Sequence, residues 1–395
     1  MSALELARGP AACHTVRLGP GLTYRRIVGE FWTAQQRQMN SLHYVISYRG
    51  SFKPELPHFF ITRYSEPGDI VFDPFMGRGT TVLEANLLGR IGWGNDANPL
   101  AERITYPKCH PVTLAEVRQA LAEVDFSDPG GDPDAEDLYM FYHEDTLREL
   151  MALRRHLRTH RSDADRFVEL IALSRLHGHS NGFFSVYSFP QISVPREAQA
   201  RINRRRRQRP AYRNVAARII QKARAALRDI NVAALRQASS KTKLTTSDSR
   251  ALEEIPEASV DLIVTSPPFL DKVDYITDNW LEYWFLGMDI DDVRARIVQT
   301  RRLEEWQRFI SDTLAELARV LRPGGVCVIE VGDVMHRGER VHLDEVVVEL
   351  ARPVGLAIEQ VFIQSQRFTK LAHCFNVENN VKGTNTNRCV VLKRR

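Results

Sequence analysis

Short apolar runs alternate with helical patterns at both ends of this chain. Near the N-terminal end, residues 69–73 form an apolar run that predicts a buried strand. A helical pattern over 82–88 then stops at Gly89, and a second strand-like run over 91–96 ends in an acid. The order strand, turn, helix, strand is typical of doubly wound α/β folds. The upstream pattern is weaker: it predicts a short helix around 30–40 and one or two helical turns before residue 64.

The same alternation returns in the C-terminal part of the chain. Strands are expected at 260–264, 326–331, 358–363 and 388–392, with helices at 304–321 and 342–351. The longer helix ends at Arg322-Pro323-Gly324-Gly325, which is a strong stop signal. These elements are of the kind that would complete the sheet begun near the N-terminus.

A mostly helical stretch separates the two α/β blocks. Its helical patterns cover 137–160, 164–177 and 211–230, after a loop at 129–133. We therefore divide the chain into a first core part, a helical insertion and a second core part, at 1–112, 113–243 and 244–395. The predicted fold class is α/β, a Rossmann-like doubly wound sheet with a mostly helical insertion.

Composition limits the class of protein. The chain has 395 residues, of which 43% are hydrophobic and 26% charged, so it can bury a sizeable core and is not disordered throughout. No apolar run reaches the roughly 18 residues of a membrane span, and the N-terminus has no secretory pattern. The five Cys contain no C-x-x-C pair, so neither a disulfide framework nor a metal site is expected. A cytoplasmic location fits these features.

Positive charge is concentrated in one segment. The formal net charge is +5, but residues 196–228 hold twelve basic residues and one acid, so this segment alone carries +11. Such a run is often a solvated face or a flexible arm, but it is also dense enough to follow the phosphates of a nucleic acid. The candidate DNA-binding residues are Arg201, Arg204, Arg205, Arg206, Arg207, Arg209 and Arg213.

A turn rich in small residues follows the first predicted strand. Its sequence is Asp73-Pro74-Phe75-Met76-Gly77-Arg78-Gly79-Thr80-Thr81. The two glycines allow a ligand close to the backbone, and Asp96 after the next strand is placed to bind a ribose diol. The turn therefore suggests an adenosine-containing cofactor. No Lys follows Gly79, which argues against a nucleotide triphosphatase.

A double proline follows the predicted strand at 260–264, within Thr265-Ser266-Pro267-Pro268-Phe269. Two prolines remove two backbone donors and stiffen the chain. The Ser266 hydroxyl and the neighbouring carbonyls are then fixed acceptors beside the ring of Phe269. Fixed acceptors and a flat ring suit an exocyclic amino group on a planar base.

The turn at 73–81 and the motif at 265–269 together resemble the S-adenosylmethionine-dependent amino-methyltransferases of DNA. The S-P-P-F form is similar to the enzymes that methylate the N4 amino group of cytosine. The resemblance implies a Rossmann-like methyltransferase sheet and S-adenosyl-L-methionine as cofactor. It implies catalytic roles for Ser266, Pro267, Pro268 and Phe269. It implies cofactor binding by His43, Tyr44, Lys53, Pro54, Asp73, Pro74, Phe75, Gly77, Gly79, Thr80, Thr81, Asp96 and Asp248.

The resemblance covers residues 41–100 and 244–393, and its motif order is unusual. The glycine turn precedes S-P-P-F, whereas many cytosine-N4 enzymes have the reverse order, and the insertion falls before residues 247–249. In the implied chemistry, Ser266 and the Pro267 carbonyl accept hydrogen bonds from the amino group of a flipped cytosine, and Phe269 stacks on the base. No Cys nucleophile is needed. The tail at 379–392 resembles the closing strand pair of these enzymes.

The expected partner is double-stranded DNA, with the protein at the nucleoid when bound, and a restriction–modification role allows for a cognate restriction endonuclease. Adenine-N6 methylation, RNA guanine-N2 methylation and a DNA-binding module with a vestigial cofactor fold remain as alternatives. Three further features stay open between core packing and function: the aromatic stretch at 183–190, the pair His177 and His179, and a loop at 270–279 that could close over the base.

Overall fold

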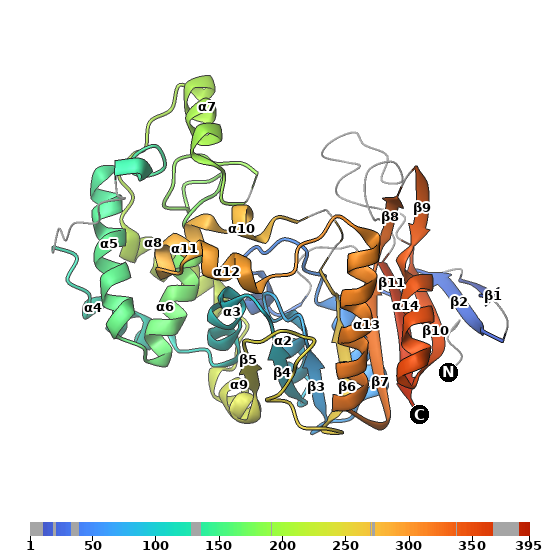
Figure 1. Ribbon diagram of the computed structural model, residues 1–395. Helices are drawn as coiled ribbons and strands as arrows, with labels where there is room; N and C mark the ends of the chain where they lie inside the picture. The colour runs from blue at the N-terminus through green and yellow to red at the C-terminus, as the bar shows by residue number, and fades with distance from the viewer. Residues whose placement is uncertain are drawn as a thin grey trace.

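A nine-stranded mixed sheet forms the centre of the protein (Figure 1). The computed structural model describes residues 11–18, 21–32, 39–127, 136–190, 192–268, 270, 273–336, 338–365 and 387–395. The strands are β1 (Ala12–Arg17), β2 (Thr23–Gly29), β3 (Ile70–Asp73), β4 (Ile91–Asn95), β5 (Lys243–Thr245), β6 (Val260–Thr265), β7 (Leu321–Val331), β10 (Leu356–Gln364) and β11 (Asn387–Arg394). Their order in the sheet is β1-β2-β10-β11-β7-β6-β3-β4-β5.

The strand order reverses at β3. From β3 the chain continues through β4 and β5 on one side and through β6 and β7 on the other, and all of these neighbours are parallel. β11 is antiparallel to both β7 and β10. Ligands of open α/β sheets bind outside the carboxyl ends of the strands at such a reversal point, which places the expected site beside the ends of β3 and β6.

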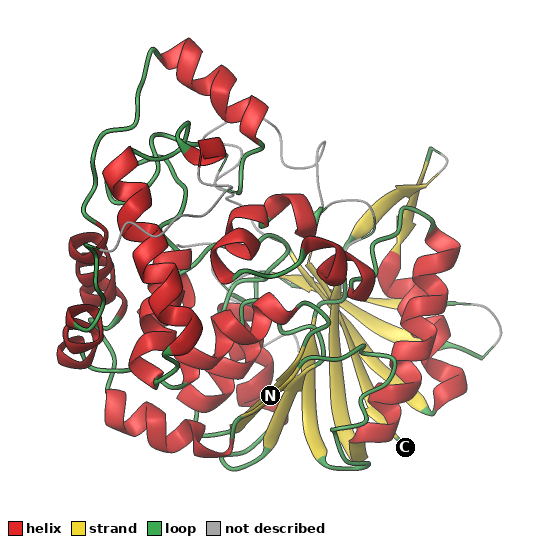
Figure 2. Ribbon diagram, turned by 60° about the vertical axis from the view of Figure 1, so that its left-hand side comes forward, coloured by secondary structure: helices red, strands yellow, loops and turns green. Residues whose placement is uncertain are grey.

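Helices cover both faces of the sheet, as Figure 2 shows. α13 (Leu303–Val320) and α14 (Leu343–Ala351) pack on one face, and α1 (Glu55–Tyr64) and α2 (Thr80–Leu87) pack on the other. The central strands are consequently buried on both faces, which explains the continuous apolar runs in the sequence. The predicted fold class is confirmed, and so are the four strands and two helices predicted in the second block.

The edge of the sheet carries a hairpin that the sequence pattern did not predict. β1 and β2 are antiparallel, and β2 adds to β10 in parallel. Residues of β1 are almost all exposed, so this strand lacks an apolar signal. The helix predicted around 30–40 falls largely on residues 33–38, which lie outside the described residues.

The helical part contains more helices than predicted. The predicted helices correspond to α5 (Glu144–Thr159), α6 (Asp163–Leu173) and α8 (Val215–Ala226), whereas the loop predicted at 129–133 lies outside the described residues. The further helices are α3 (Pro99–Cys109), α4 (Leu114–Ala122), α7 (Arg196–Arg206), α9 (Val232–Ala238), α10 (Tyr275–Asp278), α11 (Trp280–Leu286) and α12 (Ile290–Arg296). Short 3-10 helices are Ser41–Tyr44, Glu136–Leu138, Ser239–Lys241 and Arg352–Val354.

One hydrophobic core joins the insertion to α2 and α3, the helices that follow β3 and β4. Leu100 and Ile104 of α3 share this core with helices α5, α6 and α8 and with Leu281 and Tyr283 of α11. The segment 275–296, although it belongs to the second sequence block, therefore packs with the insertion. Among the described residues, no helix has both the length and the apolar character needed to cross a membrane.

Candidate active site

A pocket opens at the carboxyl ends of the parallel strands, with about 780 Å³ of empty space that includes its opening to solvent. Its walls come from both sequence blocks, because the ends of β3, β4 and β6 all reach it. The lining residues named in the sequence prediction are Asp73, Phe75, Gly77, Thr80, Asp96, Asp248, Ser266 and Pro268. The two motifs that carry the resemblance therefore face one cavity.

Asp73 connects the glycine turn to the double-proline motif. The Thr265 hydroxyl donates a hydrogen bond of 2.6 Å to Asp73 Oδ1, and the Phe75 backbone N–H donates another of 3.1 Å to the same oxygen. Burial raises the pKa of Asp73 to about 7, and these hydrogen bonds offset part of the shift. An acid in this state ionises readily when a cation enters the pocket.

The glycine turn depends on its two left-handed residues. Gly77 has a φ of 48° and Gly79 a φ of 72°. A Cβ atom at Gly79 would overlap the side chain of Thr105 on α3, so only glycine fits there. Thr81 is the second residue of α2, where its hydroxyl donates to the Val264 carbonyl at 3.1 Å, and it therefore ties the turn to β6.

Asp96 stands at the end of β4, directly opposite the turn. Its Oδ2 accepts the Gly77 N–H at 2.9 Å and its Oδ1 accepts the Asn98 N–H at 2.8 Å. Burial raises the pKa of Asp96 to about 6, against these two backbone hydrogen bonds. The carboxylate is thus fixed at the pocket wall, in the place expected for an acid that binds a ribose diol.

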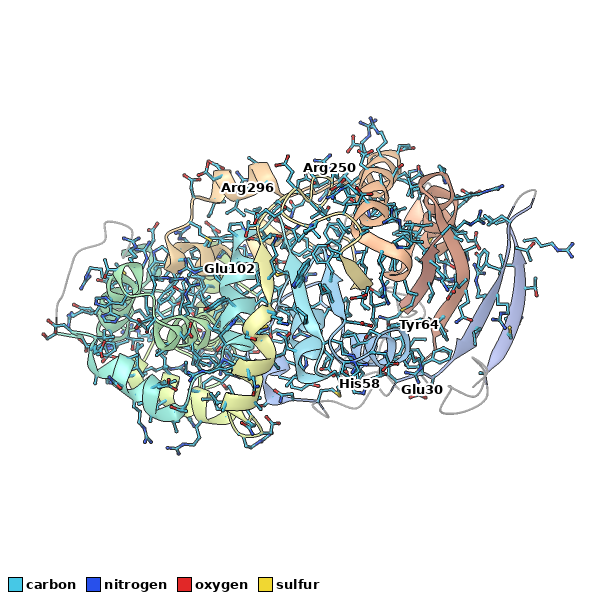
Figure 3. All side chains as sticks on the ribbon, turned by 90° about the horizontal axis from the view of Figure 1, so that it is seen from below. Glu30, His58, Tyr64, Glu102, Arg250 and Arg296 are labelled. Carbon is cyan, nitrogen blue, oxygen red and sulfur yellow. The ribbon has the colours of Figure 1, made fainter. Side chains whose placement is uncertain are left out.

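Asp248 reaches the pocket from the loop after β5. Asn95 holds this loop, because its amide donates to the Ser247 carbonyl at 2.9 Å. Arg250 forms a 2.6 Å ion pair with Asp248, and this hydrogen bond lowers the pKa of the carboxyl. In Figure 3, Arg250 and Arg296 lie on the side of the sheet away from His58 and Tyr64 of α1.

An apolar wall faces the acids. The rings of Phe75 and Phe309 lie 5.8 Å apart, and Ile297 and Val298 line the same side. A wall of this kind beside the buried acids Asp73 and Asp96 fits a cofactor that has a flat purine and a positively charged tail. The residues present therefore fit S-adenosylmethionine.

Ser266 and Pro268 also line the pocket. The Trp306 indole donates to the Pro268 carbonyl at 3.0 Å and fixes the chain after the double proline. The Ser266 Oγ is shielded from solvent and has no hydrogen bond of regular geometry within the described part of the chain. It is thus available to a ligand. Pro267, which stands between Ser266 and Pro268 in the chain, is buried, and Phe269 lies outside the described residues.

Glu330 is a site residue that the sequence reasoning missed. Thr265 pairs with Ile329 across β6 and β7, which brings the next residues, Ser266 and Glu330, side by side. Burial raises the pKa of Glu330, and the neighbouring Ser266 hydroxyl and Asn387 amide offset part of this. The Asn387 amide donates to Glu330 Oε1 at 2.9 Å. The sequence carries one signal for this residue, because Glu330 is an acid near the carboxyl end of an otherwise apolar predicted strand.

Four predicted cofactor residues upstream of the glycine turn lie outside the pocket lining, as do Pro74, Gly79 and Thr81 within the turn. His43 is buried and its Nε2 lies 2.7 Å from Glu84 Oε2. Tyr44, Lys53 and Pro54 are not among the lining residues either, and Pro54 caps α1. The lining comes instead from the residues between them, Tyr48, Arg49, Gly50, Ser51 and Phe52. Pro74 completes the turn, and its carbonyl accepts from Asn95 at 3.4 Å.

The basic segment forms α7 and the turn that follows. Arg201, Arg204, Arg205, Arg206, Arg207 and Arg209 are exposed. Figure 1 shows α7 projecting from the side of the molecule that carries the strands' carboxyl ends. Arg213 differs, because its guanidinium donates to the carbonyls of Phe183 at 2.8 Å and Ser180 at 3.3 Å. The structure therefore places Arg213 in a structural contact and does not group it with the exposed arginines.

The structure also shows the surroundings of residues from the three features that the sequence left open. His177 Nε2 lies 2.9 Å from Glu282 Oε1, so this ring joins the insertion to α11. In the aromatic stretch, Phe183 and Phe184 are buried, whereas Phe189 is 46% exposed. From the segment 270–279, Tyr275 lines the pocket.

Comparison with known proteins identifies the family. The N6/N4 methyltransferase family model, described as DNA methylase, matches residues 23–106 and 260–388, which is just over half of the chain. The chain belongs to the DNA methylase family. The match covers the turn at 73–81 and the motif at 265–269 and leaves out the whole helical insertion at 113–243.

Individual relatives are more distant. The chain is 23% identical over 292 residues to the type II methyltransferase M.BsoBI of Geobacillus stearothermophilus, covering 66% of this chain and 55% of that protein. It is 29% identical over 91 residues to M.MjaII of Methanocaldococcus jannaschii, covering 23% of this chain and 17% of that protein. It thus spans about half of the first relative and less of the second. Among solved structures, TrmN of Thermus thermophilus is 14% identical with a TM-score of 0.34, over 88% of this chain and 50% of that chain.

Proposed function

We propose that this DNA methylase transfers a methyl group from S-adenosylmethionine to the N4 amino group of a flipped cytosine in double-stranded DNA. The observation that carries the proposal is the shared pocket, in which Ser266 and Pro268 face Asp73, Asp96 and Asp248. The serine in the S-P-P-F motif favours cytosine over adenine, because the motif resembles that of the cytosine-N4 enzymes.

Asp73, Asp96 and Asp248 would hold the cofactor. The buried Asp73 carboxylate is suited to the cationic amine of the methionine part, and Asp96 to the ribose hydroxyls. Asp248 would face the adenine amino group beside the Phe75 and Phe309 rings. When bound, the cofactor supplies a methyl group on a positively charged sulfur, which is itself a strong electrophile.

Ser266 and Glu330 would act on the amino group of the base. Ser266 Oγ accepts one N–H, so that the nitrogen lone pair turns away from the ring. The amino group loses one proton when the new N–C bond forms. That proton passes to Ser266 as the serine hydroxyl proton passes to Glu330, whose raised pKa makes it an effective acceptor. Pro267 and Phe269 would complete the contacts with the base through a carbonyl and a stacked ring.

The exposed arginines of α7 would bind the DNA backbone. Arg201, Arg204, Arg205, Arg206, Arg207 and Arg209 gather on one projecting element, and Arg206 lies 3.8 Å over the Tyr187 ring. Bidentate guanidinium groups suit phosphates and guanine edges. A target base must leave the duplex to reach Ser266, so contacts on both sides of the site are needed.

A single labelling experiment tests the proposal. The protein is incubated with methyl-labelled S-adenosylmethionine and genomic DNA, the DNA is digested to nucleosides, and the labelled base is identified. Label in N4-methylcytosine is expected. Label in N6-methyladenine would move the protein to the other branch of its family, and label taken up only by RNA would overturn DNA as the substrate. A Ser266→Ala variant serves as the control for contaminating activity.

A further inference from the structure

A small hairpin projects from the sheet directly beyond the candidate active site. β8 (Asp333–His336) begins two residues after β7 ends, and it pairs antiparallel with β9 (Glu339–His342) as a separate two-stranded sheet. β7 carries Glu330 beside Ser266, so the hairpin starts at the edge of the sheet where the base would be bound. In Figures 1 and 2 the hairpin and α7 rise on the same side of the molecule, with the ends of the central strands between them.

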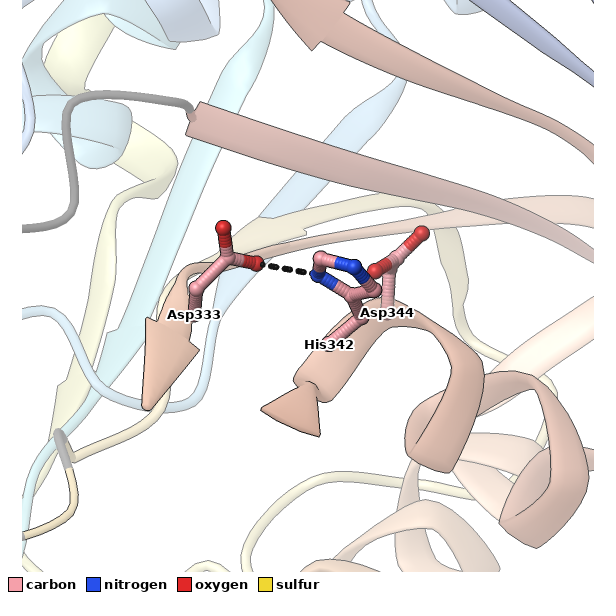
Figure 4. Close-up of side chains that lie close together, drawn as sticks. All are labelled: Asp333, His342 and Asp344. Carbon is pink, nitrogen blue, oxygen red and sulfur yellow. Dashed lines mark hydrogen bonds and ion pairs between the residues drawn. The ribbon is translucent and has the colours of Figure 1, made fainter. Parts of the chain in front are cut away.

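The base of the hairpin is fixed by a network of charges. Asp333 Oδ1 lies 2.9 Å from His342 Nδ1, as Figure 4 shows, and 2.6 Å from Arg388 Nε on β11. Asp344 on α14 pairs with Arg388 at 3.2 Å and with Arg26 of β2 at 3.0 Å. The group Asp333, His342 and Asp344 has the spacing of a metal site. Two guanidinium groups already neutralise its carboxylates, so bracing of the hairpin accounts for it.

The tip of the hairpin bears an apolar and a basic side chain together. Met335 is 67% exposed, which is the highest value among the large hydrophobic residues in the described part of the chain. It pairs across the hairpin with the exposed Arg340, on the face that also carries the braced pair of Asp333 and His342. Val334 points to the opposite face and is buried. Met335 is two residues beyond Asp333, which places it about 7 Å further along the strand.

These features suit a duplex with one base removed from its stack. Flipping leaves a gap between neighbouring base pairs, and proteins that open DNA often insert an apolar side chain, including Met, between base steps. A guanidinium beside that side chain can bind the flanking phosphate. A flexible tip could not keep the gap open. This tip is held in place because the charge network at Asp333 and Asp344 fixes the base of the hairpin.

We propose that the β8–β9 hairpin is a second DNA-contact element, which inserts Met335 into the duplex at the target step and binds a neighbouring phosphate through Arg340. It would work opposite α7, so that the DNA lies across the carboxyl edge of the sheet. This inference rests on the proposed action on duplex DNA.

The test compares duplex and single-stranded DNA. Met335→Ala, Met335→Leu and wild-type protein are given labelled S-adenosylmethionine with genomic DNA, either double-stranded or denatured by heat. We expect Met335→Ala to lose on the order of tenfold in the initial rate on duplex but less than about twofold on single strands, since these have no stack to open. Met335→Leu should keep most of the duplex rate. Equal losses on both substrates, or none on the duplex, would overturn the inference.

A binding measurement covers Arg340 and does not depend on turnover. The Kd for a fluorescent 30-base-pair duplex should rise several-fold in Arg340→Ala and stay unchanged in Arg352→Ala, an exposed arginine after α14 at the other end of that helix. Unchanged affinity in Arg340→Ala would count against the phosphate contact. If wild-type protein labels no nucleic acid, the proposed function fails, whereas variants that match an active wild type refute only the hairpin's role. Thermal unfolding confirms that each variant is folded.

Discussion

Thr265 donates a hydrogen bond of 2.6 Å to Asp73 across 192 positions of sequence. The donor begins the double-proline motif, and the acceptor begins the glycine turn. The helical insertion separates the two motifs in the chain, and this bond joins them together with the pairing of β3 and β6 and the hydrogen bond from Thr81 to Val264. These contacts fix their relative position in the ligand-free protein, which is the condition for placing a methyl donor against an amino group.

The state of Asp73 predicts a pH dependence of cofactor binding. Its pKa is raised to about 7 by burial, so the carboxyl is largely neutral below that pH in the ligand-free protein. A cationic cofactor prefers the ionised form, and the Kd for S-adenosylmethionine should therefore fall as pH rises through about 7. Titration calorimetry at several pH values measures this dependence.

Two variants separate Asp73 from its neighbour. Asp73→Asn should bind S-adenosylmethionine weakly, and its Kd should no longer show the inflection near pH 7. Asp96→Asn should keep that inflection and lose a second one, which we expect near pH 6. Asp73→Asn should also stabilise the ligand-free protein. A raised carboxyl pKa means that folding stability is lost as pH rises from the ordinary value of 3.8 to about 7, so Asp73→Asn should raise Tm most at about pH 8. An unchanged inflection in Asp73→Asn would show that another group causes it.

Ser266 and Glu330 should affect turnover more than cofactor binding. Ser266→Ala removes the acceptor for the amino group and should lower kcat by on the order of a hundredfold. Glu330→Gln retains the shape but cannot take the proton, so it should lower kcat similarly and weaken its dependence on pH. The Kd for S-adenosylmethionine should change by less than about threefold in both. Equal losses of turnover and cofactor affinity would place these residues in the cofactor site.

Much of the fold could be predicted from the sequence because the central strands are buried on both faces. β6 contains the apolar run Leu262-Ile263-Val264 for this reason, and the strong stop signal at Pro323 and Gly324 closely follows the end of α13. β1 lacks such a signal because almost all of its residues are exposed, and α7 lacks it because most of its residues are polar or charged. Pairing with β10 and β1 defines β2, and no local pattern reports that.

The candidate site could be predicted only where one short motif supplies it. The turn at Gly77 and Gly79 needs glycine for a local reason, which a sequence displays. Tyr48 and Tyr275 line the pocket and Glu330 lies beside Ser266 only through tertiary packing, which elements far away in the sequence determine. The predicted His43 lies one helical turn before the segment that lines the pocket and binds Glu84 instead.

The contact between Gly79 and Thr105 predicts a large effect of a single methyl group. Gly79→Ala meets both a left-handed φ of 72° and the Thr105 side chain. Gly324→Ala has a similar φ of 78° but open space around it, so it measures the backbone cost alone. We expect Gly324→Ala to cost about 1 kcal/mol of unfolding free energy and Gly79→Ala about 2 to 4 kcal/mol. Chemical unfolding gives both values, and similar costs would mean that Thr105 moves aside.

The arginines of the insertion should divide into two functional groups. Replacing Arg204, Arg205, Arg206 and Arg207 by Ala removes four exposed charges from α7 and its C-terminal end. The Kd for duplex DNA should rise steeply at low salt, and the slope of log K against log salt should become shallower by up to about 3.6, since each phosphate contact contributes about 0.9. Stability should hardly change. Arg213→Ala should do the opposite, because its guanidinium binds the carbonyls of Phe183 and Ser180. It should lower Tm by several degrees and leave the salt slope within about one unit. An unchanged slope in the fourfold variant would exclude α7 from DNA binding.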